Sequence, residues 1–114
     1  MSDDLFMKII DREIPADIVH EDDELLAFRD IDPQAPVHIL VVPKRRIPTI
    51  NDVEAQDAEL VGRMVLAAKR IAAEEGLSGD GYRLVFNCNE QGGQSVFHIH
   101  LHLLGGRRMS WPPG

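Results

Sequence analysis

Histidine and aliphatic residues alternate strictly from His98 to Leu103, near the end of a chain of 114 residues. Successive side chains of a β-strand point to opposite faces, whereas a helix would distribute the same residues around its circumference. The alternation therefore predicts a strand from Val96 to Leu104, with His98, His100 and His102 on one face. The aliphatic residues between them would pack on a core. Any fold for this chain must contain a sheet with one such aliphatic face.

The rest of the chain carries further strand patterns and two amphipathic helix patterns. The predicted elements are a helix over 5–12, strands over 18–21, 25–30, 37–42 and 82–88, and a long helix over 51–75. Asn51 is the predicted N-cap of the long helix, with Glu54 as its capping-box partner, and Gly76 lies just past its end. Because short turns between strands favour antiparallel pairing, we expect one α+β domain over residues 1–114, with a tail over 105–114.

Charge and composition narrow the classes of partner. The formal net charge of −7 argues against nucleic acid and against an anionic membrane surface, since binders of both usually carry a basic patch. The chain contains one cysteine, Cys88, so it has no intrachain disulfide framework, which suits a reducing compartment. The first residues, Met1–Asp4, lack the basic and apolar pattern of a signal peptide. These features predict a soluble, cytoplasmic protein without a membrane span.

Three interpretations of the histidine face are open. It could be an exposed polar face, a zinc site completed by His38 and Cys88, or a nucleophilic and acid–base site in which neighbouring imidazoles orient one another. The preceding loop, which contains Gly92-Gly93, Gln94 and Ser95, favours the third. Glycines let backbone N–H groups approach an anion, and the two polar side chains add neutral donors. The combination is typical of a phosphate site.

The run His98-Ile99-His100-Leu101-His102-Leu103-Leu104 resembles the signature of the histidine triad (HIT) superfamily. Further segments look like its Hint branch, the purine nucleoside phosphoramidases, and the similarity extends from Leu5 to Gly114. These segments are Phe28-Arg29-Asp30-Ile31, Pro33-Gln34-Ala35-Pro36-Val37-His38, Val42-Pro43-Lys44, Gly92-Gly93-Gln94-Ser95-Val96, Gly105-Gly106-Arg107 and Trp111-Pro112-Pro113-Gly114.

The resemblance implies a five-stranded antiparallel sheet with one long and one short helix, and a homodimer whose sheets join into one of ten strands. It also implies hydrolysis of purine nucleoside 5′-phosphoramidates, such as adenylyl-amines and adenylyl-lysine, to a nucleoside monophosphate and an amine. The reaction would need no metal and no cofactor. The expected partners are therefore purine nucleoside monophosphates and phosphoramidates and a second copy of the chain.

By position in the motif, the resemblance makes His100 the nucleophile and His98 and His102 its flanking histidines. It also assigns catalytic positions to His38, the upstream histidine, and to Ser95, near the leaving amine. The implied nucleotide-binding residues are Asp30 and Asp32 at the ribose, Asn87, Gly93, Gln94 and Val96 at the phosphate, Leu5, Phe6, Ile9, Ile14, Phe28 and Ile31 around the base, and Trp111 in the tail. Four residues depart from the family pattern, namely Asp32, Arg46, Cys88 and Gln91.

Two other functions compete with phosphoramidate hydrolysis. A sister branch with the same triad hydrolyses dinucleoside polyphosphates, although the tail of this chain and its compact length favour Hint. A nucleotide-sensing binding module is the alternative from a different class. The retention of His100 and Ser95 argues against a degenerate site.

Overall fold

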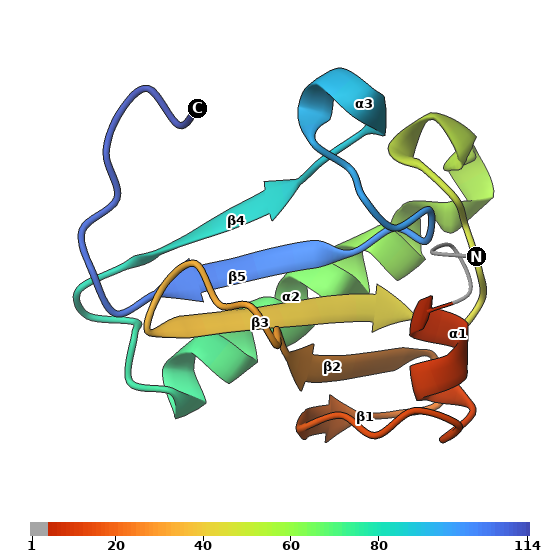
Figure 1. Cartoon of the computed structure of the whole chain (residues 1–114), viewed down its shortest axis with the longest axis horizontal. Helices are drawn as coiled ribbons and strands as arrows, with labels where there is room; N and C mark the ends of the chain where they lie inside the picture. The colour runs from red at the N-terminus through yellow and green to blue at the C-terminus, as the bar shows by residue number, and fades with distance from the viewer. Residues whose placement is uncertain (1–4) are drawn as a thin grey trace.

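The computed structural model describes residues 5–114. The expectation about a signal peptide concerns Met1–Asp4, which lie outside the described residues. Five strands form one antiparallel sheet in the order β1-β2-β3-β5-β4 (Figure 1). The elements are α1 (Leu5–Ile10), β1 (Ile18–Glu21), β2 (Leu25–Arg29), β3 (Val37–Pro43), the 3₁₀ turns η2 (Ile50–Asp52) and η3 (Ala55–Asp57), α2 (Ala58–Glu74), β4 (Tyr82–Phe86), α3 (Asn89–Gly92) and β5 (Leu101–Gly105). The predicted fold class is confirmed, and α3 adds a helical turn where a loop was expected. No helix within residues 5–114 is both long and apolar enough to span a membrane.

The sheet is covered on both faces, with α2 behind it and α1 in front in Figure 1. On the α2 side, Ile39 and Val41 of β3 and Leu101 and Leu103 of β5 are in one buried cluster with Met64 and Ile71 of the helix. On the α1 side, a second cluster contains Phe6, Ile9, Leu26, Phe28, Leu40, Val42 and Val96. The alternation of each strand divides its residues between these clusters. The histidines of the motif fall on the α1 side, as their spacing predicts.

The last strand is shorter than predicted, because β5 begins at Leu101 rather than at Val96. In the β3–β5 register Leu101 pairs with Val41, so continuing the ladder would set Ile99 opposite Pro43. Proline has no N–H to donate, so β3 ends there and pairing stops. The backbone N–H of Ile99 instead donates to the carbonyl of Ile47 at 2.7 Å. The segment before β5 therefore keeps its alternation but is held by the chain that follows β3.

The start of the long helix was also predicted wrongly. Asn51 lies inside the 3₁₀ turn η2, and its backbone N–H donates to the Thr49 side chain, which is the true N-cap of that turn. The Asp52 carboxylate accepts the Thr49 N–H at 3.1 Å. This capping box begins the turn, which ends after three residues because the backbone of Val53 is extended (ψ 127°). At the other end the prediction holds: Gly76 has φ +77° and follows the last helical turn.

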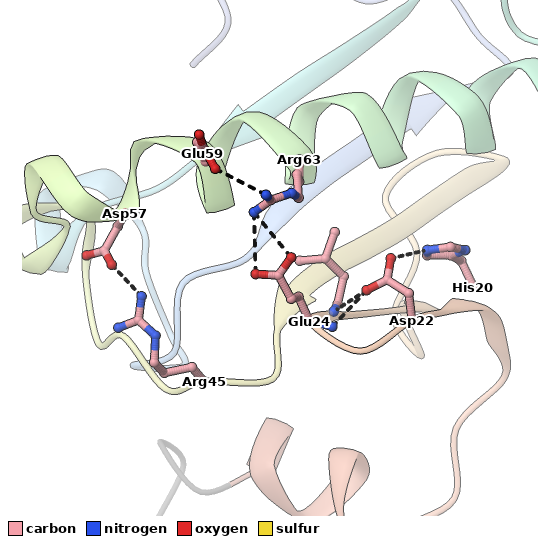
Figure 2. A network of polar contacts seen from close by, with 8 residues as sticks. His20, Asp22, Glu24, Arg45, Asp57, Glu59 and Arg63 are labelled. Carbon is pink, nitrogen blue, oxygen red and sulfur yellow. Dashed lines mark hydrogen bonds and ion pairs between the residues drawn. The ribbon is translucent and has the colours of Figure 1, made fainter.

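A second capping arrangement delays α2 again. Glu54, predicted as a capping partner of Asn51, is itself an extended residue (φ −102°) whose N–H donates to the Asp57 carboxylate at 2.9 Å. Asp57 is buried and also accepts from the Arg45 guanidinium, which fixes it to the chain after β3 (Figure 2). The hydrogen bond from the Glu54 N–H, and after it the contact with Arg45, hold the pKa of Asp57 below its usual range. The continuous helix therefore begins only at Ala58.

The turn between β1 and β2 is joined to α2 by a polar network (Figure 2). One carboxylate oxygen of Asp22 accepts the Glu24 N–H at 2.8 Å, and the other lies 3.0 Å from Nε2 of His20. Arg63 of α2 lies 3.2 Å from both Glu24 and Glu59. His20 of β1 also contacts the helix, since Nη2 of Arg70 lies 2.8 Å from its Nδ1.

Candidate active site

A pocket of about 260 Å³ opens on the α1 side of the sheet. Its walls are largely apolar, and four polar residues line it, namely Asp30, Ser95, His100 and His102. The apolar lining residues are Leu5, Phe6, Ile9, Ile14, Pro15, Ala16, Phe28, Ile31, Leu40 and Val96. All six residues predicted around a base are among them. Sequence reasoning missed Pro15, Ala16 and Leu40, although Leu40 lies two residues after His38 on the same face of β3 and could have been found by that period.

Four histidines gather at one end of the pocket. His38, His98 and His100 are buried, and His102 is half-buried. The rings of His100 and His102 have centroids 4.9 Å apart, and those of His38 and His102 are 5.2 Å apart. His38 reaches the motif because β3 pairs with β5 in a register that sets Leu40 opposite His102, and His38 lies two residues from Leu40 on the same face. The sheet therefore joins the upstream histidine to the motif across 64 residues of sequence.

Backbone carbonyls fix the tautomers of two histidines. Nδ1 of His100 lies 2.8 Å from the carbonyl oxygen of His98, and a carbonyl only accepts, so Nδ1 carries the proton. Nε2 of His100 is therefore an unprotonated nitrogen with a free lone pair. Nε2 of His98 donates in the same way to the carbonyl of Pro43 at 2.6 Å. Phe6 lies edge-on to the His100 ring, with centroids 4.9 Å apart, and limits how that ring can turn.

A backbone N–H fixes the tautomers of the other two histidines, His38 and His102. The Gln34 N–H donates to Nδ1 of His38 at 3.0 Å, so the neutral His38 ring carries its proton on Nε2. That N–H lies 2.9 Å from Nδ1 of His102, which must accept. The proton of His102 is then on Nε2, and this atom has no hydrogen-bond partner within residues 5–114. The hydrogen bonds that run from the Gln34 N–H through His38 to His102 therefore end at the Nε2–H of His102, which has no partner within residues 5–114, on a ring that lines the pocket.

Burial keeps these rings neutral. It lowers the pKa of His38, His98 and His100 below the usual value, and it lowers the pKa of His102 from 6.5 to about 4. The Asp30 carboxylate, 3.5 Å from Nε2 of His38, opposes this effect on His38 without reversing it. At neutral pH Nε2 of His100 therefore keeps a lone pair on a ring that lines the pocket, Nδ1 of His98 keeps a buried lone pair, and His102 keeps a free N–H.

The side chains of Asp30, His38 and His102 lie close enough together to suggest a metal site, the one such group within the described residues. The hydrogen bonds argue against it. A metal at Nε2 of His38 would require the proton on Nδ1, where the Gln34 N–H already points. Cys88, the expected further ligand of a zinc site, is not part of the group. The donor set resembles a zinc shell in composition, but its protonation does not fit one.

The loop before the motif is arranged differently from the expectation. Both hydrogens of the Gln94 side-chain amide are used, in bonds to the carbonyls of Pro48 and Val96 at 2.8 and 3.0 Å. Its carbonyl oxygen accepts the Asn89 N–H at 2.9 Å, and its own N–H donates to the Asn89 carbonyl. Gln94 therefore holds the loop in place and has no N–H left for a phosphate. Ser95, by contrast, is exposed and lines the pocket.

The remaining predicted residues lie outside the pocket lining; they are Asp32, Asn87, Gly93, Gln94, Trp111, His38 and His98. Asp32 still contacts the site, since its N–H donates to the Asp30 carboxylate at 2.9 Å. Trp111 is 82% exposed. His38 and His98 lie behind the two histidines that line the pocket, and they reach it through hydrogen bonds to those residues.

Residues 11–109 match the family model described as the HIT domain. The chain belongs to the HIT family. It is 59% identical over 103 residues to the purine nucleoside phosphoramidase of Escherichia coli strain K12, with 90% of this chain and 87% of that protein covered. It is 58% identical, over the full length of both, to an uncharacterised HIT-like protein of Synechococcus elongatus.

Solved structures of the HIT family agree closely with the fold. A HIT family hydrolase from Legionella pneumophila superposes with a TM-score of 0.95 at 62% identity, covering 96% of this chain and 98% of that one. A histidine triad protein from Clostridium difficile gives a TM-score of 0.90 at 40% identity, with 93% and 92% covered. The resemblance inferred from the motif is therefore confirmed for the family and the fold.

Proposed function

We propose that this HIT-family chain hydrolyses purine nucleoside 5′-phosphoramidates to a nucleoside monophosphate and an amine. The observation that carries the proposal is the unprotonated Nε2 of His100 in a ring that lines an apolar pocket. The name of the Escherichia coli relative, purine nucleoside phosphoramidase, supports the same reaction. The apolar pocket walls suit the faces of a purine, and Asp30, which also lines the pocket, suits the ribose hydroxyls.

In this reaction the Nε2 lone pair of His100 forms a bond to the α-phosphorus, and the P–N bond breaks with its electron pair on nitrogen. The leaving nitrogen takes a proton from the exposed Ser95 hydroxyl, which family position sets near the amine, and Ser95 recovers a proton from the water that attacks in the next step. The free N–H of His102 stabilises the phosphate oxygens. Water then cleaves the nucleotidyl-histidine and regenerates the neutral ring. The donors in this proposed path, the Ser95 hydroxyl and the His102 N–H, are neutral groups of the chain itself, so the path uses no metal.

Turnover of an adenylyl-amine by the wild type and by His100→Gly tests the proposal. We expect the variant to lose turnover while it keeps its fold and its affinity for the nucleoside monophosphate. Diadenosine triphosphate is the comparison substrate, because preferential cleavage of it would favour the sister branch. If the protein binds the monophosphate but cleaves neither substrate, the phosphoramidase proposal is wrong and a nucleotide-sensing module is the function that fits. Activity of His100→Gly equal to that of the wild type would remove the nucleophile assignment.

The chain is also proposed to form a homodimer, with α2 and β4 at its interface. β4 is an edge strand of the sheet, and an exposed edge offers unpaired backbone groups to a second copy. Val65 of α2 is 40% exposed and offers apolar surface to such a copy, whereas Leu66, which is 62% exposed, lies near Asp22 and Leu25 at the β1–β2 turn. By family resemblance, the tail with Trp111 reaches the partner's pocket. Cytoplasmic location stays a prediction.

A further inference from the structure

The loop between β2 and β3 sets the protonation pattern of the site, because the Gln34 N–H decides which nitrogen of His38 carries a proton. This loop, residues 31–36, is largely exposed. Within it, the Gln34 side chain donates to the Asp32 carbonyl at 2.9 Å, and the Asp32 N–H donates to Asp30. These bonds are local, so they shape the loop without fixing its position over β5.

The chain after β5 supplies contacts that do fix it. Nη2 of Arg107 donates to the Gln34 carbonyl at 3.0 Å, and Nη1 donates to the Arg108 carbonyl at 3.2 Å. Gly106, with φ +90°, lies against Pro36 so closely that a Cβ there would be 2.8 Å from the proline Cβ. Gln34 is thus held at its carbonyl by Arg107 and bonded at its N–H to His38.

We propose that Arg107 is a positioning residue, which holds the main chain of Gln34 so that the Gln34 N–H keeps His38 and His102 in the tautomers that leave the His102 N–H free. Without that bond, the Gln34 N–H can move off Nδ1 of His38. The ring could then exchange its proton between the two nitrogens. Each exchange would reverse the donor in the His38–His102 bond and convert the free N–H of His102 into a lone pair, which repels phosphate oxygens.

Two variants separate this role from a general effect of charge. Arg107→Met removes the guanidinium but keeps much of the side-chain length. Arg108→Met is the matched control, since it removes the neighbouring exposed arginine, whose carbonyl rather than side chain takes part in the contact. Arg107→Lys should rescue, because an ammonium can still donate to the Gln34 carbonyl. Both arginines are exposed, so the fold should persist in all three variants.

The first measurement is a long-range ¹H–¹⁵N correlation spectrum of the histidine rings in the nucleotide-free protein, which reports the tautomer directly. In the wild type, Arg108→Met and Arg107→Lys, we expect single tautomers with the proton on Nε2 for His38 and His102. In Arg107→Met, we expect the two nitrogen shifts of each ring to move toward each other. Unchanged ring signals in Arg107→Met would overturn the proposal, whether or not the protein has phosphoramidase activity.

The second measurement rests on the proposed function. For an adenylyl-amine, Arg107→Met should lower kcat/KM about fivefold, the effect of losing one hydrogen bond of ordinary strength. The loss should appear mainly in kcat, because the purine pocket is untouched. A rise in KM alone would contradict a role in tautomer selection. If the wild type does not cleave the substrate, the proposed function fails while the ring spectra still decide the role of Arg107.

Discussion

Gln94→Met should destabilise the free protein, because the side-chain amide joins three parts of the chain. Methionine has a similar length but cannot donate to the carbonyls of Pro48 and Val96 or accept from the Asn89 N–H. Each lost hydrogen bond costs about 1 kcal/mol net, and a buried group left without a partner costs more. The Val96 carbonyl bond is buried, and the other two are partly buried and accessible to replacement by water.

These terms give a loss of about 2–4 kcal/mol in the free energy of unfolding. For a chain of this length, the corresponding fall in Tm is roughly 8–16 °C. Urea unfolding followed by circular dichroism measures the free energy, and a thermal scan gives the Tm. Gln91→Met is the control, since Gln91 is an exposed residue of the same loop and should change stability by under about 0.5 kcal/mol.

The competing explanation of Gln94 is the one its position in the motif suggested, a direct contact with phosphate. In that case Gln94→Met would leave the stability of the nucleotide-free protein unchanged and raise only KM. A loss of under about 0.5 kcal/mol in Gln94→Met would therefore refute the structural role derived from its hydrogen bonds. If the structural role holds, kcat/KM should also fall, because the same loop positions Ser95 and Val96 at the pocket.

Three further outcomes are expected. Chelators should leave turnover of an adenylyl-amine unchanged, and a loss that zinc or magnesium restores would contradict the tautomers of His38 and His102. Sedimentation at micromolar concentration should give a particle of twice the 12.8 kDa chain mass, and a monomer would contradict the proposed interface. Stability should fall as pH is lowered from 6.5 toward 4, since the folded pKa of His102 is depressed to about 4 and the unfolded state binds more protons in that window. A flat stability profile over that range would show that the ring is not kept neutral.

The histidine cluster could be predicted from the sequence because it depends on a period of two. Alternation placed His98, His100 and His102 on one face, and this survived even though β5 begins only at Leu101. The early end of pairing follows from Pro43, whose position opposite Ile99 depends on the β3–β5 register. The sequence shows the proline but not the register. The strand boundary was therefore wrong while the face assignment was right.

The hydrogen bonds that give the cluster its chemistry could not be predicted in this way. One partner of Gln94, the Pro48 carbonyl, lies 46 residues away in the chain, and the partner of His98 lies 55 residues away. The Gln34 N–H reaches His38 only through the shape of a loop. The same limit applied to α2, where Thr49 and Glu54 form local capping arrangements that look like helix starts in a linear pattern. Both arrangements cap a 3₁₀ turn, and the linear pattern does not show that Val53 and Glu54 between the two turns are extended.

An anionic substrate and a chain of net charge −7 are compatible because the pocket offers neutral donors rather than positive charge. Among the described residues that line it there is neither lysine nor arginine. A protonated histidine beside the phosphate would bind it more tightly, but protonated His100 would have no lone pair with which to attack. Burial keeps all four rings in the neutral form, and fixed hydrogen bonds then decide which nitrogen donates and which attacks. The apolar environment that weakens attraction to the substrate is therefore the same one that keeps the nucleophile usable at neutral pH.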